Sequence, residues 1–371
     1  MQWIKSCKSN FKKLIGTNWF NFVCIFPKKN KMKYVFKSLW LITILISITT
    51  CKDENNDDLN QQKTWVFVAC EGNFGASNGS ISMINELGEV YSVDNVGDVV
   101  QSLEVYEDKL FVIVNNSSII KAYDITDEGL SLPGIELSTD GSSPREMKIF
   151  NNKLYFTNWN TNDIKILNLD NYVIEGSIPV NGKPESIEIY ENHIYTGIQL
   201  NDDYSDGNQL VKINIDSNSI SENFEIGSGP TSIKIFDQKI YIANTFYDSS
   251  FNAFYGSSRI DLSNGQVSVN NYGSGTVCGG SVLKYDSSIY RSYDGGIAIL
   301  DEQLNILDET KIGFYNPSQL YSSEVIGDLI YFGITNYSDI NQVKVVDFSN
   351  NEIASYEVGL FPGDFAYWES N

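Results

Sequence analysis

The sequence predicts an all-β fold, a seven-bladed β-propeller of four-stranded antiparallel blades, and three observations lead to it. A unit of about 40 residues recurs, each copy holds two short strands joined by a two-residue polar turn, and no long helical period occurs. The clearest copies are PREMKIFNNKLYFTNW from Pro144, PESIEIYENHIYTGIQ from Pro184 and PTSIKIFDQKIYIANT from Pro230. Alternation at period two around Asn-Asn, Glu-Asn or Asp-Gln is a hairpin signal, and a strand-only repeat of this length is typical of propellers.

An aromatic residue in the second strand of each unit counts the blades. Its positions are Phe67, Phe111, Tyr155, Tyr195, Tyr241, Tyr290 and Tyr331. The spacings are 44, 44, 40, 46, 49 and 41 residues, so the unit stays constant while its loops vary. Weaker copies of the first strand start at Ser102, Ser281 and Ser322. Seven copies predict seven blades.

The two ends of the domain predict how the ring closes. Residues 52–63 are polar and acidic, so the first blade has no inner strand before Trp65. PGDFAYW, from Pro362, reads as an inner strand with nothing after it. We expect this last strand to pair with residues 65–69, so that residues 64–371 form one closed domain with its core between the blades.

The segment before the domain indicates export. Residues 32–50 combine a basic start with an apolar run too short for a comfortable membrane span. The run ends at Cys51, which resembles a bacterial lipoprotein signal and implies a lipidated Cys51 on an acidic tether, residues 51–63. Thr49 and Thr50 depart from the usual small residues, and a plain signal anchor is the alternative. Residues 1–31 are basic and contain no acid, so we expect them to be a non-native upstream extension, with Met32 as the biological start.

The charge of the chain excludes one class of partner. The full sequence carries 26 basic and 47 acidic residues. Residues 1–50 hold nine of the lysines and no acid, which leaves 17 basic residues and a net charge of −30 after their removal. A surface of this sign repels nucleic acid and anionic membranes, so we expect neither as a direct partner.

The sequence offers little for catalysis or for a cofactor. The single histidine, His193, lies at the short-turn end of its blade, which favours a structural role and excludes a multi-histidine metal site. Cys70 and Cys278 lack a CxxC partner, and their separation makes a disulfide an unfavoured pairing. The glycine runs at Gly227 and Gly273 precede strands, unlike phosphate-binding loops. We therefore expect no enzyme activity, no metal and no cofactor.

The loops between the second and third strands carry the main functional signal. They are long and aromatic, whereas the turns between the first and second strands have only two residues. All the long loops of a propeller lie on one face, where aromatics beside amides suit a large, partly apolar ligand or a partner protein. Several of these side chains are expected to tuck down as blade caps. The candidate ligand-binding residues are Asn73, Phe74, Trp159, Tyr204, Phe246, Tyr247, Phe254, Tyr255, Tyr293 and Tyr337, with Phe251 on the same loop as four of them.

The repeat resembles the YVTN, or YncE-like, β-propellers. Their namesake tetrapeptide is nearly intact as YFTN at 155–158 and YIAN at 241–244, and the resemblance covers residues 64–369. EGNFGASNGSISMIN, from Glu71, is similar to the opening of YncE-like surface lipoproteins of Bacteroidetes. Some members of that group capture cobalamin for a TonB-dependent outer-membrane transporter. The resemblance specifies the fold more strongly than the function, because propellers host many activities.

Two functions from different classes follow. The first is a surface-exposed, lipid-anchored outer-membrane protein that binds cobalamin or another corrinoid and passes it to a TonB-dependent transporter. The alternative is an adhesin-like propeller that binds a glycan or a protein and takes no small molecule. Titration with a corrinoid would discriminate between them.

Overall fold

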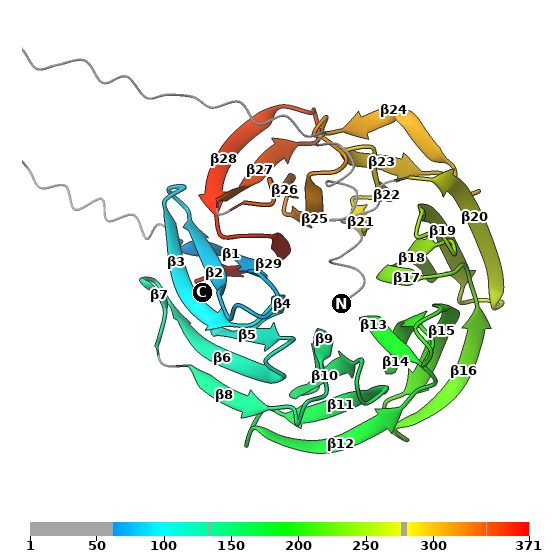
Figure 1. Cartoon of the computed structure of the whole chain (residues 1–371), viewed down its shortest axis with the longest axis horizontal. Helices are drawn as coiled ribbons and strands as arrows, with labels where there is room; N and C mark the ends of the chain where they lie inside the picture. Colours follow the sequence, from blue (N-terminus) through cyan, green and yellow to red (C-terminus); the bar gives the residue numbers. More distant parts are fainter. Residues whose placement is uncertain (1–61, 133, 276–279, 339, 371) are drawn as a thin grey trace, which may run out of the picture. The chain divides into compact units, whose positions relative to one another are not determined.

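The computed structural model describes residues 62–370, except 133, 276–279 and 339. The expected signal segment, Cys51 and Cys278 therefore lie outside the described residues. Gln62–Asn371 form one compact unit, and its strands build seven antiparallel sheets arranged as a ring (Figure 1). The predicted seven-bladed β-propeller is confirmed.

Each blade runs outward from an inner strand, and blade one is closed by the C-terminal strand. From inside to outside, the blades are β29 (Pro362–Glu369), β1 (Thr64–Cys70), β2 (Gly79–Asn85) and β3 (Val90–Gly97); β4 (Val100–Tyr106), β5 (Lys109–Val114), β6 (Ile119–Thr126), β7 (Gly129–Leu130) and β8 (Ile135–Ser138); β9 (Pro144–Phe150), β10 (Lys153–Asn158), β11 (Asp163–Asn168) and β12 (Val173–Pro179); β13 (Lys183–Tyr190), β14 (His193–Leu200), β15 (Asp206–Asn214) and β16 (Ser219–Glu225). The last three are β17 (Pro230–Phe236), β18 (Lys239–Tyr247), β19 (Ala253–Asp261) and β20 (Gln266–Ser274); β21 (Val282–Tyr285), β22 (Ser288–Tyr293), β23 (Gly296–Leu300) and β24 (Ile306–Ile312); β25 (Leu320–Ile326), β26 (Leu329–Ile334), β27 (Asn341–Asp347) and β28 (Glu352–Val358).

The ring closes as the sequence predicts. β29 pairs with β1 in antiparallel register, with Trp368 opposite Trp65 and Ala366 opposite Phe67. Blade two departs from four strands, because β6 pairs with both β7 and β8 where the other blades have one outer strand.

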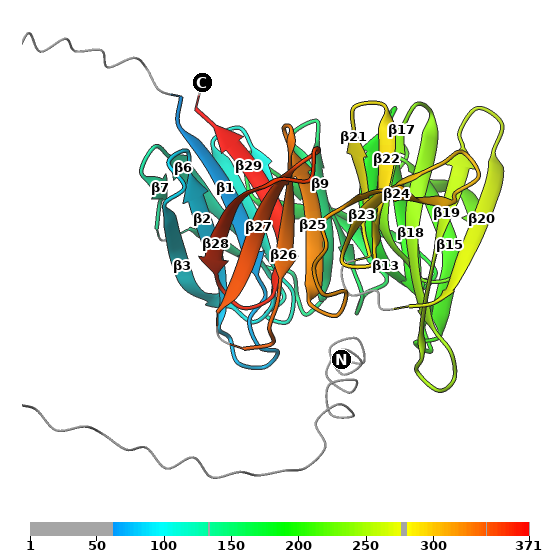
Figure 2. The same cartoon turned by 90° about the horizontal axis from the view of Figure 1, so that it is seen from above.

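The turns between first and second strands have the left-handed conformation that tight hairpins need. Both turn residues have positive φ in three blades, for example 49° and 58° at Asn151 and Asn152. Two successive positive φ values define the turn whose twist matches the flanking strands. These short turns lie on one side of the ring and the longer loops on the other (Figure 2).

The hydrophobic core lies between neighbouring blades. Tyr155 of blade three packs in one cluster with Ile187 and Ile194 of blade four, and Tyr195 of blade four packs with Ile233 and Ile240 of blade five. The recurring aromatic is therefore an inter-blade contact. This packing holds the seven inner strands side by side around the axis.

Candidate binding site

The residue opposite each recurring aromatic lies on an inner strand, and in five blades it is charged. Glu104, Lys148, Glu188, Lys234 and Glu324 pair in register with Phe111, Tyr155, Tyr195, Tyr241 and Tyr331. We call these five residues the charge ladder. Their signs alternate over blades two to five, and Glu324 of blade seven lies between the uncharged residues Leu283 of blade six and Ala366 of blade one.

Contacts between blades hold the charge ladder together. Lys148 Nζ lies 3.2 Å from a carboxylate oxygen of Glu104, and Lys234 Nζ lies 3.7 Å from one of Glu188. Burial disfavours the charge on Lys148, but Glu104 and Glu188 outweigh that effect, so the pKa of Lys148 lies above its ordinary value. The pKa of Lys234 is raised chiefly by Glu324. Lys148 and Lys234 thus each interact with two acidic residues of other blades.

A second group of polar residues lies where the inner strands begin, toward the long loops. Arg145 donates two hydrogen bonds to the carboxylate of Glu185, from Nε at 2.8 Å and from Nη2 at 2.6 Å. A third, from Nη1 to Oε1 of Gln101, measures 2.8 Å. The guanidinium also stacks on the ring of Trp159, with 4.5 Å between Cζ and the ring centroid. Paired on its edge and stacked on its face, this guanidinium is held in one orientation.

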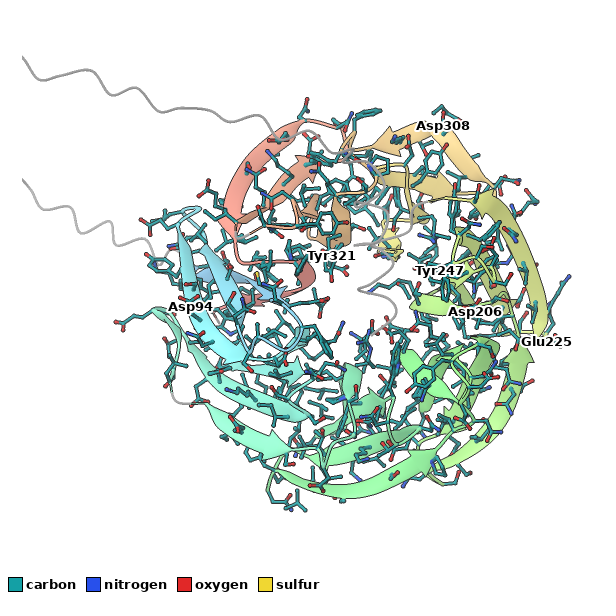
Figure 3. The ribbon with its side chains drawn as sticks, viewed as in Figure 1. Asp94, Asp206, Glu225, Tyr247, Asp308 and Tyr321 are labelled. Carbon is teal, nitrogen blue, oxygen red and sulfur yellow. The ribbon has the colours of Figure 1, made fainter. Side chains whose placement is uncertain are left out.

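Glu71 and Tyr321 face the same guanidinium from blades one and seven. Burial raises the pKa of Glu71 to about 7, although the Tyr321 hydroxyl and Arg145 oppose the shift. The pKa of Tyr321 is raised well above its usual value by burial and by Glu71. Gly363 lies against both side chains, since a Cβ there would approach Glu71 Oε1 at 3.0 Å. Tyr321 lies beside the axis of the ring, whereas Asp94, Glu225 and Asp308 lie at its periphery (Figure 3).

We call Glu71, Gln101, Arg145, Trp159, Glu185 and Tyr321 the axial cluster. It offers a fixed cation with an aromatic face, a carboxyl group that titrates near neutrality, and a phenol. Such groups can orient the polar atoms of a ligand. The only rim aromatic predicted from the sequence that belongs to this cluster is Trp159. Its buried Nε1 has no hydrogen-bond acceptor among the described residues.

The other rim residues fall into three groups. On the β18–β19 hairpin, Phe246 and Phe254 stack with 5.6 Å between ring centroids, and Tyr255 packs on Tyr272 at 5.2 Å. These rings are half-buried and stiffen the stem of the hairpin. Tyr247, which precedes the tip, donates its backbone N–H to Asp206 of the neighbouring blade at 3.1 Å (Figure 3).

A second group is tucked down as predicted for blade caps. Tyr337 donates its hydroxyl to the backbone oxygen of Ser318 at 2.6 Å, and its ring lies 6.0 Å from that of Phe361. Tyr293 lies beside Lys311 of the outer strand, away from the axial cluster. Asn73 is half-buried and helps to form the β1–β2 loop through its backbone.

The third group is exposed at loop tips and consists of Phe74, Tyr204 and Phe251. Tyr204 is 56% exposed and lies beneath Lys183, whose Nζ is 4.4 Å from the ring centroid. Phe251 is 63% exposed and has a positive φ of 60°.

Phe251 is an unfavourable residue type for the conformation that its turn requires. Five hairpins of this chain use the same five-residue turn, in which the fourth residue has positive φ. That residue is Gly88, Tyr204, Phe251, Leu304 or Asn350. Glycine and asparagine tolerate this conformation, and Leu304 is fully buried. Tyr204 and Phe251 both combine a disfavoured backbone with an exposed ring, a combination often found at functional sites.

Sequence reasoning missed the charge ladder and most of the axial cluster. A signal was present, because the fourth residue after each strand-initiating proline is Lys148, Glu188 or Lys234. Gln101, Arg145 and Tyr321 are the second residues of their inner strands and Glu185 is the third of its own, yet only the ring geometry brings them together.

Metal and thiol chemistry find little support among the described residues. No group of three or more His, Cys, Asp or Glu is arranged to hold a metal ion within the part of the chain that is described. His193 lies at the start of β14, where its Nδ1 is 2.9 Å from the backbone oxygen of Glu191. Cys70 is a buried free thiol whose pKa is raised to about 11 by burial. No helix in the described ranges is long and apolar enough to cross a membrane.

Comparison with known proteins identifies the architecture. No family profile and no curated protein matches the sequence. Among solved structures, apo AztD from Citrobacter koseri is 13% identical with a TM-score of 0.53, over 83% of this chain and 98% of that one. A protein from Lactobacillus plantarum is 11% identical with a TM-score of 0.59, over 83% and 99%. A hypothetical selenium-binding protein from Sulfolobus tokodaii is 8% identical with a TM-score of 0.62, over 84% and 93%. At these identities the likeness establishes the propeller fold alone.

Proposed function

We propose that this chain is a binding protein that captures a small molecule on the loop-rich face of its propeller and performs no catalysis on it. The axial cluster would fix polar groups of the ligand, and the rim aromatics would cover its apolar surface. The observation that carries this proposal is the Arg145 guanidinium, held by Glu185 and Gln101 and stacked on Trp159. Such preorganisation lowers the entropic cost of binding.

A corrinoid, cobalamin above all, is the ligand we propose. The support is the resemblance of the segment from Glu71 to cobalamin-capturing surface lipoproteins. Aromatic rings beside asparagine amides also suit a large ligand with both apolar and amide surfaces. On the same resemblance we propose a lipid anchor at Cys51, exposure on the outer membrane, and delivery to a TonB-dependent transporter.

Calorimetric titration of residues 52–371 with cyanocobalamin and, in parallel, with cobinamide tests this proposal. Saturable heat with cyanocobalamin is the expected result. A difference in affinity between cyanocobalamin and cobinamide would show whether the protein contacts the nucleotide loop of the ligand. Absence of heat and of any thermal shift with both ligands would reject the corrinoid.

Variants test the face on which the ligand binds. W159A should weaken ligand binding by tenfold or more, since it removes one stacking surface, on the scale of about 1.4 kcal/mol per tenfold change. Y91A is a matched control, because Tyr91 is an exposed aromatic on the outer strand β3. If W159A and wild type bind with equal affinity, the ligand does not bind at Trp159 and the proposed site is wrong.

One observation favours the alternative, an adhesin-like propeller that binds a protein or a glycan. Phe251 is an exposed anchor at a loop tip, and exposed aromatic anchors are common at protein interfaces. If neither corrinoid binds while the F251N variant loses attachment to cells, the interaction function stands instead.

A further inference from the structure

Arg291 is a buried arginine in a position that is uncharged in every other blade. It lies on β22 directly after the recurring aromatic Tyr290, and its exposed fraction is 0%. The corresponding residues of the other blades are Val68, Val112, Phe156, Thr196, Ile242 and Phe332, each following its own aromatic. Blade six thus places a guanidinium where packing between blades otherwise needs an uncharged side chain.

The contacts of Arg291 are weak for a buried cation. Nη1 lies 3.4 Å from the backbone oxygen of Ser281 and 3.2 Å from that of Ser292, and Nη2 lies 3.5 Å from that of Asn244. Nε is buried and has no acceptor within the described part of the chain. These are long distances for hydrogen bonds from a charged donor.

The other two arginines of the chain show what is missing. Arg145 has the carboxylate of Glu185 at 2.6 Å, and Arg259 is only part-buried. Arg291 has no carboxylate partner among the described residues. Burial therefore lowers its pKa to about 10, and only Tyr272 and Tyr255 oppose that shift. A buried cation without a counter-charge is costly to the folded state.

A second buried group points to the same place. The hydroxyl oxygen of Thr245, a residue 2% exposed, has no hydrogen-bond partner among the residues that the structure describes. The surroundings of Gly280 show that the Thr245 hydroxyl lies near the guanidinium of Arg291. A Cβ on Gly280 would approach Thr245 Oγ1 at 2.9 Å, and both Arg291 Nη2 and Thr231 Oγ1 at 3.5 Å. Arg291 Nη2 and the hydroxyl oxygens of Thr245 and Thr231 thus lie close together beside Gly280, between blades five and six. The Thr231 hydroxyl lies within hydrogen-bond distance of the backbone oxygens of Gly280 and Ala243, at 3.1 and 3.2 Å, which leaves Arg291 and Thr245 as the groups in need of a partner.

We propose that Arg291 and Thr245 form a buried binding site for a small anion, of the size of chloride or formate. The anion would accept hydrogen bonds from the guanidinium and the Thr245 hydroxyl and would neutralise the buried charge. Side-chain donors and a cation are the ligands that such an anion prefers. This site is independent of ligand capture at the axial cluster.

The test is an anion dependence of stability, measured on residues 52–371 because the compact unit lies within them. Sodium chloride replaces sodium isethionate, whose anion is too large, at constant ionic strength. The melting temperature should rise by about 2 °C when chloride reaches ten times its Kd, and formate should act similarly. T245V should raise the half-saturating concentration about fivefold, as expected for the loss of one hydrogen bond.

Arginine variants separate the site from a general salt effect. R291M should lose the chloride response, whereas R259Q, a change at a part-buried arginine of blade five, should retain it. Equal melting temperatures in the two salts, or a chloride response that R291M keeps, would overturn the proposal. If R291M does not fold, wild-type crystals in bromide decide the matter. An anomalous peak beside Arg291 and Thr245 supports the site, and its absence rejects it.

Discussion

Glu146 and Asp364 occupy the same position on the inner strands of blades three and one, and each is bonded to the next blade. Glu146 Oε2 accepts the backbone N–H of Ile187 at 3.2 Å, and Asp364 Oδ2 accepts that of Leu103 at 2.7 Å. Burial raises the pKa of Glu146 to about 8, helped by Glu185 and Asp364, and raises that of Asp364 to about 6. Two acids that join blades are thus more easily protonated than acids in water.

The first prediction is that E146Q stabilises the protein at alkaline pH. The folded-state pKa of Glu146 is about 8 and its ordinary value is 4.5, so the native state binds more protons between these values. The contribution of this group is complete below pH 4.5 and is lost as the pH rises through 8. E146Q keeps an oxygen acceptor for Ile187 and removes the titration. Urea unfolding should show E146Q nearly equal to wild type at pH 4.5 and more stable at pH 8.5, by up to about 4 kcal/mol if the whole shift acts on folding. A difference that does not change with pH would contradict this.

The second prediction concerns the alternation of the charge ladder. An isolated ion pair can be inverted, but Glu188 and Lys234 each have a further charged neighbour, Lys148 and Glu324. The double variant E188K/K234E would place two lysines side by side and two glutamates side by side. We therefore expect it to be less stable than wild type by about 2 kcal/mol, no better than either single variant. Inverting Glu104, Lys148, Glu188, Lys234 and Glu324 together should recover most of the loss. Full rescue by the double variant would show that the ladder is a set of independent pairs.

The fold could be predicted because its signals are local. Each recurring aromatic packs between two blades. The same position therefore holds a phenylalanine or a tyrosine in all seven copies, from Phe67 to Tyr331. The pairing of β29 with β1 was predictable because only one strand at each end lacked a partner. The division of the outer strand of blade two into β7 and β8 has no comparable signal, and it was missed.

The axial cluster could be predicted only in part because its members meet across the ring. Trp159 was predicted as a loop aromatic. Its partner Arg145 lies 14 residues earlier in the sequence, and its orientation depends on hydrogen bonds to Glu185 in the next blade. Arg291 was missed for the opposite reason. A single arginine after Tyr290 looks like an exposed strand residue until its six counterparts are aligned by structure.

The third prediction is that F251N stabilises the folded domain. Asparagine tolerates a positive φ better than phenylalanine, and it already fills the equivalent position at Asn350. Because Phe251 is 63% exposed, little packing is lost, and the melting temperature should rise by about 1–2 °C. L304N is the matched control in the same turn type. Leu304 is fully buried, so this change should destabilise the domain by about 2–4 kcal/mol. A lower melting temperature for F251N would mean that the ring has packing partners in the free protein.

The fourth prediction tests closure of the ring. β29 supplies the inner strand of blade one, and Trp368 lies in the core cluster shared by blades one and two. Trp368 also donates its Nε1–H to Asp108 in the first turn of blade two, at 2.9 Å. W368A should therefore cost about 3–5 kcal/mol in unfolding free energy, and a chain ending at residue 361 should fail to give a cooperative thermal transition. Y367A is the control, because Tyr367 is exposed on the same strand and should change stability by less than about 1 kcal/mol. A cooperative transition in the truncated chain would show that six blades and an open seventh are stable alone, and that closure contributes less than the packing of β29 implies.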